Sequence, residues 1–176
     1  MDAPRVILTA SVATAVVVAW AFAAEVFAPP TVSMPEGDEV CLSSQNSRDY
    51  LVSVSFTNDG RDPVILRDTF AASLDDVSVT HTWVVSPEFS PGFAAVSYTP
   101  QAIEDWGLVD AAGTSVAPDE SVDLVYRLVA SSGRGRATDF TVDYTDRYGL
   151  HQRTSSPFAA GFYSGTAQPD SLAECD

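Results

Sequence analysis

The side chains with the most reactive chemistry in this chain are two histidines and two cysteines. His81 and His151 are its only imidazoles, and Cys41 and Cys175 are its only thiols. A zinc or copper site needs three or four such ligands at close spacing, and no CxxC pair is present. Nothing in the spacing brings the two histidines together. We therefore predict two independent histidines, no metal site and no cofactor.

The two cysteines favour a disulfide instead. A bridge between Cys41 and Cys175 would join the beginning of a domain to its end, because the two residues flank almost everything after residue 40. Closing a loop of that length stabilises a fold by about 5 kcal/mol in the chain-entropy model. Disulfides persist in oxidising compartments, so the predicted bridge also favours an exported domain. Two unpaired thiols are the alternative.

Acidic turns raise the question of calcium. The clusters are Asn58 with Asp59 and Asp62, Asp75 with Asp76, and Asp143 with Asp146. The ligand spacing of an EF-hand is absent, and Asp and Asn are common turn formers. Turn formation is therefore the main interpretation, and calcium binding is the alternative.

Hydrolase signatures are weak in this sequence. The segment 113–117 comes nearest to a serine nucleophile elbow, but it lacks the second Gly and the strand-to-helix setting. Glycoside hydrolysis needs a selected pair of carboxylates, and none stands out among 24 acidic residues. Four aromatic residues could form a sugar platform but are more typical of a core or its rim: Trp83, Trp106, Tyr98 and Tyr148. We predict no catalytic residues.

The stretch Val6–Ala24 has the length and composition of a membrane span. Its 19 residues carry no charge and include Trp20. As a helix they would reach roughly 28 Å, close to the ~30 Å hydrocarbon core of a bilayer. We predict that residues 1–28 form a signal anchor. The alternative is a signal peptide, because a small-x-small pattern allows cleavage near Ala23 or Ala24, which would give a secreted domain.

Charge near the span predicts its orientation. Arg5 is the only basic residue close to either end, and the positive-inside rule then places the N-terminus inside and the rest of the chain outside the cell membrane. Residues 29–39 hold three prolines and three acidic residues, which favour an extended spacer. Residues 40–176 form the predicted domain.

The predicted exported part is strongly acidic. After residue 28 it keeps eight of the nine basic residues and 22 of the 24 acidic ones, a net charge of −14. This excludes nucleic acid as a partner, because phosphate binding needs clustered Lys and Arg. All basic residues are Arg, and Asp outnumbers Glu 17 to 7. A GC-rich genome and adaptation to high salt both explain this composition.

Period-two alternation predicts short strands along the domain. The predicted strands are residues 40–43, 49–57, 63–66, 77–85, 93–98, 121–129, 140–144 and 150–154. Tyr50, Val52, Val54 and Phe56 share one face of their strand, as do Val77, Val79, His81, Trp83 and Val85 of theirs. Three further inward-facing sets are predicted in the later strands: Val122, Leu124, Tyr126 and Leu128, then Phe140, Val142 and Tyr144.

Two segments lack this alternation. Residues 99–107 read as a short helix with a Thr cap, Pro at its first position and a terminal Gly. Ile103 and Trp106 would lie on one side of it and plug an end of the sandwich. Residues 155–176 show no clear period, so we predict an irregular C-terminal tail.

These elements predict an all-β fold. We expect an antiparallel β-sandwich of about seven to eight strands, preceded by one N-terminal transmembrane helix. The segment 54–64 resembles the early hairpin of immunoglobulin-like domains in prokaryotic cell-surface proteins. The run 117–124 is similar to their segment of proline, acidic turn and strand. The resemblance implies an immunoglobulin-like sandwich that binds or spaces rather than catalyses.

The sequence therefore predicts a non-catalytic, membrane-anchored extracytoplasmic module for interaction or envelope structure. Its partners would be the membrane, through the N-terminal helix, and another envelope or membrane protein. An accessory subunit that packs on a larger membrane complex through Thr9, Ser11 and Thr14 of its span is the first alternative. A secreted hydrolase is the second.

Overall fold

The computed structural model describes residues 31–34, 39–43, 47–85 and 95–163. No helix within these ranges is long and apolar enough to cross a membrane. The predicted span Val6–Ala24 and the predicted disulfide partner Cys175 lie outside the described residues. The membrane anchor and the Cys41–Cys175 bridge therefore stay predictions.

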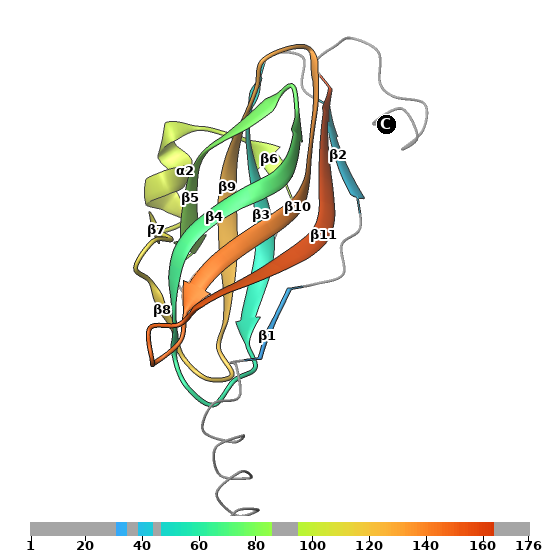
Figure 1. Ribbon diagram of the computed structural model, residues 1–176. Coiled ribbons are helices and arrows are strands. Elements are labelled where there is room, and N and C mark those ends of the chain that lie inside the picture. The colour runs from blue at the N-terminus through green and yellow to red at the C-terminus, as the bar shows by residue number, and fades with distance from the viewer. Residues whose placement is uncertain (1–30, 35–38, 44–46, 86–94, 164–176) are drawn as a thin grey trace, which may run out of the picture.

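The chain folds into two facing sheets (Figure 1). Sheet A has the strand order β1 (Val32–Ser33), β3 (Asp49–Asn58), β9 (Ser121–Ala130), β5 (Val77–Val85) and β7 (Leu108–Asp110), and β6 (Ala95–Ser97) also pairs with β3. Sheet B has the order β2 (Glu39–Ser43), β11 (His151–Tyr163), β10 (Arg134–Thr145), β4 (Val64–Asp75) and β8 (Ser115–Val116). The predicted β-sandwich is confirmed.

Two details of the predicted fold are wrong. The described residues hold eleven strands rather than seven or eight, because β1, β7 and β8 have only two or three residues and are too short to show alternation. The sheets are also not wholly antiparallel. Residues 159–163 of β11 pair in parallel with residues 39–43 of β2.

The main core lies between the sheets and confirms most predicted inward faces. All the inward-facing residues predicted in β3, β9 and β10 belong to one buried cluster: Tyr50, Val52, Val54, Phe56, Val122, Leu124, Tyr126, Leu128, Phe140, Val142 and Tyr144. Aromatic rings join the two sheets across it. The Tyr50 and Phe162 rings stack with centroids 4.6 Å apart, and Tyr126 meets Phe140 edge-on at 4.8 Å. Each such pair adds roughly 0.5–1.5 kcal/mol beyond the area it buries.

A β-bulge in β5 overturns the prediction that residues 77–85 present a single apolar face. The pairing of β5 with β9 shifts between Val79 and His81, which leaves Thr80 as the extra residue. Before the bulge Val77 and Val79 contact the main core, whereas after it Val84 does. Trp83 therefore faces the opposite side of sheet A, and His81 is exposed.

The predicted hairpin over residues 54–64 is also wrong. β3 lies in sheet A and β4 lies in sheet B, so the turn between them carries the chain across the sandwich. Asn58, wholly buried, fixes this turn: its amide nitrogen donates to the carbonyl of Asp62 at 2.9 Å and to that of Val116 at 3.1 Å. These contacts are tertiary, and a local turn signal does not reveal them.

The predicted helix is confirmed as α2 (Pro100–Asp105), but it does not plug an end of the sandwich. It begins after Thr99 with Pro at its first turn, and Gly107 follows its end at φ +57°. α2 lies beside sheet A (Figure 1). Ile103 and Trp106 pack against residues of that sheet that lie outside the main core. With Leu51, Trp83 and Val125 they form a second apolar cluster, which we call the outer cluster.

The first part of the predicted tail is strand instead of irregular chain. β11 continues from His151 to Tyr163, and its last residues lie between β10 and β2. Ala159, Ala160 and Gly161 are all buried there. Residues 159–161 are small and uniformly buried, so no alternation appears in the sequence.

Candidate functional site

The two histidines lie in different sheets. His81 lies on β5 in sheet A, whereas His151 begins β11 in sheet B. Within the described ranges no three side chains of His, Cys, Asp or Glu gather closely enough to hold a metal ion. Cys41 lies on β2.

Each acidic turn has partners inside the protein. Asp62 accepts a hydrogen bond from Arg147 at 2.9 Å, and an oxygen of Asp76 accepts one from Ser132 at 2.8 Å. Asp143 binds two nitrogens of Arg153 at 2.6 and 2.9 Å, which lowers the pKa of its carboxyl group. These contacts use the carboxylates for turn and strand geometry, the main interpretation drawn from the sequence.

The hydrolase candidates do not converge. Ser115 lies in β8, a two-residue strand of sheet B, rather than between a strand and a helix. Trp83, Trp106 and Tyr98 pack together in the outer cluster, while Tyr148 is 47% exposed in the turn after β10. The four aromatic residues therefore form no common platform.

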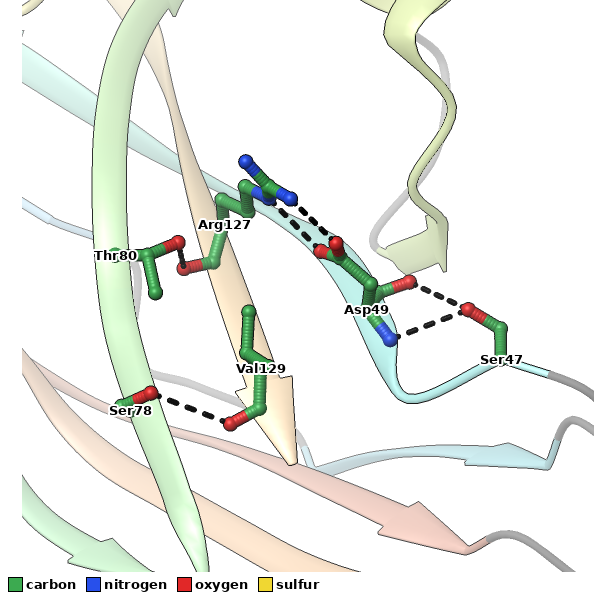
Figure 2. Close-up of polar contacts among 6 residues, drawn as sticks. All are labelled: Ser47, Asp49, Ser78, Thr80, Arg127 and Val129. Carbon is green, nitrogen blue, oxygen red and sulfur yellow. Dashed lines mark hydrogen bonds and ion pairs between the residues drawn. The ribbon is translucent and has the colours of Figure 1, made fainter. Parts of the chain in front are cut away.

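A bidentate ion pair stands on the outward face of sheet A beside the outer cluster (Figure 2). Nε and Nη2 of Arg127 donate to the two carboxylate oxygens of Asp49 at 3.0 and 2.6 Å. The guanidinium carbon lies 3.9 Å from the centroid of the Tyr98 ring. The hydrogen bonds that Arg127 donates to Asp49 raise the pKa of its guanidinium group, which keeps its full charge at any physiological pH.

The ion pair and its polar neighbours stabilise the contact between adjacent strands rather than forming a ligand site, because their polar groups bond to one another within the protein. The hydroxyl of Ser47 donates to the carbonyl of Asp49 at 2.8 Å, and the hydroxyl of Thr80 donates to the carbonyl of Arg127 at 3.3 Å (Figure 2). Both side chains of the ion pair are about one-third exposed or less, at 30% and 27%. Its net contribution is then about 1 kcal/mol after screening by solvent.

The best candidate site among the described residues is a groove between the two sheets, lined by residues of the consecutive strands β4 and β5. It has a volume of about 290 Å³ and is lined by residues 67–69 of β4, residues 79–82 of β5 and residues 110–112. Small-molecule pockets span about 300–1,000 Å³. The groove is therefore suited to a side chain or a short piece of extended chain.

Polar side chains line this groove. Nε2 of His81 donates to Oδ1 of Asp110 at 2.5 Å, and the imidazole ring lies against Trp83 with centroids 4.3 Å apart. Asp68 is on the β4 side, and its Oδ1 accepts the backbone N–H of Thr69 at 2.8 Å. The hydroxyl groups of Thr69, Thr80 and Thr82 also line the groove.

On the same side of the molecule, β4 and β5 each have an edge that is paired over only part of its length among the described residues. Among the described residues, β8 pairs with β4 only at Val64 and Ile65, and β7 pairs with β5 only from Trp83 to Val85. Loop residues 113–114 bond both backbone groups of Leu66. Within the described part of the chain, no strand or loop pairs with this edge of β4 beyond Leu66. We call residues 67–75 of β4, residues 77–81 of β5 and the groove between them the open side.

The β4 edge carries few of the features that usually keep strand edges apart. Natural edges are commonly blocked by Lys or Arg, by Pro or by extreme shortness. Residues 69–74 of β4 read Thr-Phe-Ala-Ala-Ser-Leu, without a charge or a proline, and Leu74 is 44% exposed. The part of β11 that extends beyond β2 has Arg153 and Pro157 on such an edge. The sequence did not reveal the open side, because it depends on which strands lack partners.

Comparisons with known proteins give weak likenesses. No known family matches the chain, and no curated protein matches it. The VesB protease of Vibrio cholerae aligns with 81% of this chain at a TM-score of 0.39 and 12% identity, and the chain spans 34% of that protein. A PapD-like domain of human CEP192 aligns with 80% of the chain at 0.39 and 10% identity, over 90% of that domain. A cohesin module from Clostridium perfringens gives 0.23 and 13% identity over 74% of this chain and 97% of that module. At these scores the likenesses carry no argument about activity.

Proposed function

We propose that this protein is a non-catalytic extracytoplasmic interaction module, held at the cell membrane by residues 6–24, that binds a protein partner along its open side. The observation that supports the proposal most directly is the β4 edge from Thr69 to Leu74. Among the described residues β8 pairs with β4 only at Val64 and Ile65, and the segment 69–74 beyond them carries no charge and no proline. Such an edge can take up an additional strand from a partner, whose main-chain hydrogen bonds supply affinity.

The accessory-subunit alternative places the contact elsewhere. There the partner would hold the chain through small and hydroxyl residues of the predicted span, such as Thr9 and Ser11. A partner on the open side would depend on β4 and not on the identity of the span. The two functions therefore predict different sensitive positions.

The test is the molar mass of the native assembly. The full-length chain is extracted from its own membrane in mild detergent, and the mass of its complex is measured by mass photometry. Ala72→Lys places a charge on the exposed β4 edge, and Ser155→Lys makes a matched change on exposed β11. We expect Ala72→Lys to release the chain from its complex, while Ser155→Lys leaves the complex intact.

Two results would overturn the proposal. One is a complex of unchanged mass with Ala72→Lys. The other is a complex that falls apart only when residues 6–24 are replaced by an unrelated apolar span, which would establish the accessory-subunit alternative.

A further inference from the structure

We infer that the turn between β10 and β11, residues 146–150, lies in the interfacial layer of a membrane with zwitterionic headgroups and orients the domain on that membrane. The inference rests on the part of the proposed function that holds the chain by residues 6–24, and it goes further by assigning the domain a lipid contact of its own. Three features of the described residues support it: where the chain enters the domain, which side chains the turn exposes and how its backbone is hydrogen-bonded.

The chain enters the sandwich at the end where this turn lies. β1 is antiparallel to β3, and its first residue, Val32, pairs with Asn58, the last residue of β3. β10 is antiparallel to β4 and ends at the same place, because Thr145 pairs with Ile65 near the start of β4. Figure 1 shows β1 and the β10–β11 turn at one end of the two sheets. A membrane span that precedes β1 therefore places this end toward the bilayer.

Direct contacts join the turn to the point of entry. Nδ2 of Asn58 donates to the carbonyl of Asp62 at 2.9 Å, and Oδ1 of Asp62 accepts from Nη1 of Arg147 at 2.9 Å. From Ala24, the end of the predicted span, to Val32 the chain advances by eight residues, which reach at most roughly 28 Å. The headgroup layer on each side of the hydrocarbon core is about 5–8 Å thick. The link is therefore short enough to hold this end of the domain next to the headgroups.

The turn exposes apolar surface at this end. Tyr148 is 47% and Leu150 is 54% exposed, and they are two of the four large apolar side chains exposed among the described residues. The guanidinium carbon of Arg147 lies 4.5 Å from the centroid of the Tyr148 ring, and Nη2 of Arg147 donates to its hydroxyl. Tyrosine is enriched at membrane–water interfaces, where its ring meets the acyl chains and its hydroxyl meets the headgroups. Leu150 adds apolar area beside it.

The backbone of the turn is already hydrogen-bonded at three successive residues. Oδ1 of Asp146 accepts the N–H groups of Tyr148 and Leu150 at 2.8 and 2.9 Å. The N–H of Gly149 donates to the carbonyl of Asp146 at 3.0 Å. A backbone donor without a partner is costly to take out of water. Because these three donors have partners within the turn, the turn can enter the interfacial layer without leaving them unsatisfied.

Charge favours zwitterionic over anionic headgroups. The guanidinium group of Arg147 is paired with Asp62. The adjacent turns expose Asp59, Arg61 and Asp119 at the same end, and the N–H of Asp119 donates to a carbonyl of the β3–β4 crossover at 2.8 Å. An anionic surface would repel this excess of carboxylates and the net charge of −14 after residue 28. A headgroup such as phosphatidylcholine, which carries one charge of each sign, does not.

Fluorescence quenching in the full-length chain tests the inference. The protein is placed in phosphatidylcholine nanodiscs, and Trp20→Phe removes the tryptophan of the predicted span. Leu150→Trp then adds a probe in the turn. Leu74→Trp is the matched control, because it makes the same change at an exposed leucine nine residues along β4 from Ile65, or about 30 Å away. Each variant is measured in ordinary phosphatidylcholine and in phosphatidylcholine brominated near the headgroup end of its acyl chains, because bromine quenches tryptophan at short range.

We expect the brominated lipid to remove roughly half or more of the emission that Leu150→Trp adds, and almost none of the emission that Leu74→Trp adds. Adding Tyr148→Ser to Leu150→Trp should at least halve the quenching. This second change removes one of the two apolar side chains of the contact, whereas the link to the span is unaltered.

The emission of Trp20 in the unmodified chain tests the anchor separately. If Trp20 is quenched and the Leu150→Trp probe is not, the inference is wrong while the proposed function stands. If Trp20 is not quenched, the membrane part of the proposed function fails and the inference fails with it. Equal quenching of the Leu150→Trp and Leu74→Trp probes would overturn the inference, since the domain would then have no fixed orientation. Quenching that Tyr148→Ser leaves unchanged would also overturn it, because the short link alone would account for the result.

Discussion

Asn58 offers the sharpest test of how this fold is held together. Its side chain is wholly buried, and its amide nitrogen donates to the carbonyls of Asp62, Val116 and Ala117 at 2.9, 3.1 and 3.1 Å. Its amide oxygen accepts the N–H of Gly60 at 3.0 Å. Because an amide has two N–H groups, one of them is shared between two of the carbonyls. The residue thus joins the β3–β4 crossover to the chain before β9.

Asn58→Asp replaces the buried amide group by a carboxyl group of nearly the same shape. The new carboxylate can still accept from Gly60, but it has no hydrogen to donate when ionised. Two donor hydrogens are lost, and each leaves a buried carbonyl without its partner at a loss of about 1–3 kcal/mol. The expected destabilisation is therefore about 2–6 kcal/mol before any charge repulsion. A domain of this size has roughly 5–15 kcal/mol of stability in total.

The destabilisation caused by Asn58→Asp should change with pH in one direction. Burial among carbonyl oxygens raises the pKa of the introduced carboxyl group in the folded state above its unfolded value of about 3.9. The charge penalty is therefore absent below about pH 4 and grows by about 1.4 kcal/mol per pH unit until the folded pKa is reached. Asn58→Ala loses the same donors but introduces no titratable group, so its destabilisation should stay constant with pH.

Urea unfolding of the detergent-solubilised chain, followed by near-ultraviolet circular dichroism between pH 4 and pH 7, measures both variants against the unmodified protein. Using differences from the unmodified protein cancels the titration of its own carboxylates. A loss of less than 1 kcal/mol for both variants would refute the role assigned to Asn58. The same difference at every pH for Asn58→Asp would refute the argument about its buried carboxylate.

Two further predictions concern the core, and urea unfolding checks each of them. The hydroxyl of Tyr126 is buried and has no hydrogen-bond partner among the described residues, so Tyr126→Phe should leave stability unchanged or raise it by about 1 kcal/mol. Tyr50→Phe is its control and should lose about 1 kcal/mol, because its hydroxyl donates to a backbone carbonyl at 2.7 Å; equal effects of the two changes would contradict the reasoning. Gly135→Ala should lose about 1–3 kcal/mol, since a Cβ there would clash with Cγ2 of Val77. Adding Val77→Ala should recover part of that loss, and strictly additive effects of the two changes would rule out the clash.

The sequence predicted the inward-facing residues correctly in strands where every second side chain packs in the main core. In β3 and β9 every second residue faces the main core, so alternation from Tyr50 to Phe56 and from Val122 to Leu128 gave the correct faces. The pattern failed at β5, because the bulge at Thr80 reverses the faces within a single strand. It also failed in β11, where residues 159–161 are buried throughout.

The candidate site could not be predicted from the sequence, for a different reason. His81 and the acidic residues were visible, but neither the pairing of His81 with Asp110 nor the groove follows from their spacing. Both depend on β4 and β5 lying in different sheets, a consequence of tertiary contacts such as those of Asn58. An open edge is a property of the strands that do not pair, and no local pattern records it.

The order of strands in sheet B has a mechanical consequence. β2 lies at one edge of this sheet, and β4 lies three strands away, next to the short β8. A pull that enters through β2 and leaves through a partner strand on β4 would cross the β2–β11, β11–β10 and β10–β4 ladders in series. Before that load reaches β2, it would meet β1, which is held to β3 by only two paired residues, Val32 opposite Asn58 and Ser33 opposite Thr57. Tension applied at the N-terminal side should therefore separate β1 from sheet A first, while the ladders of sheet B stay folded.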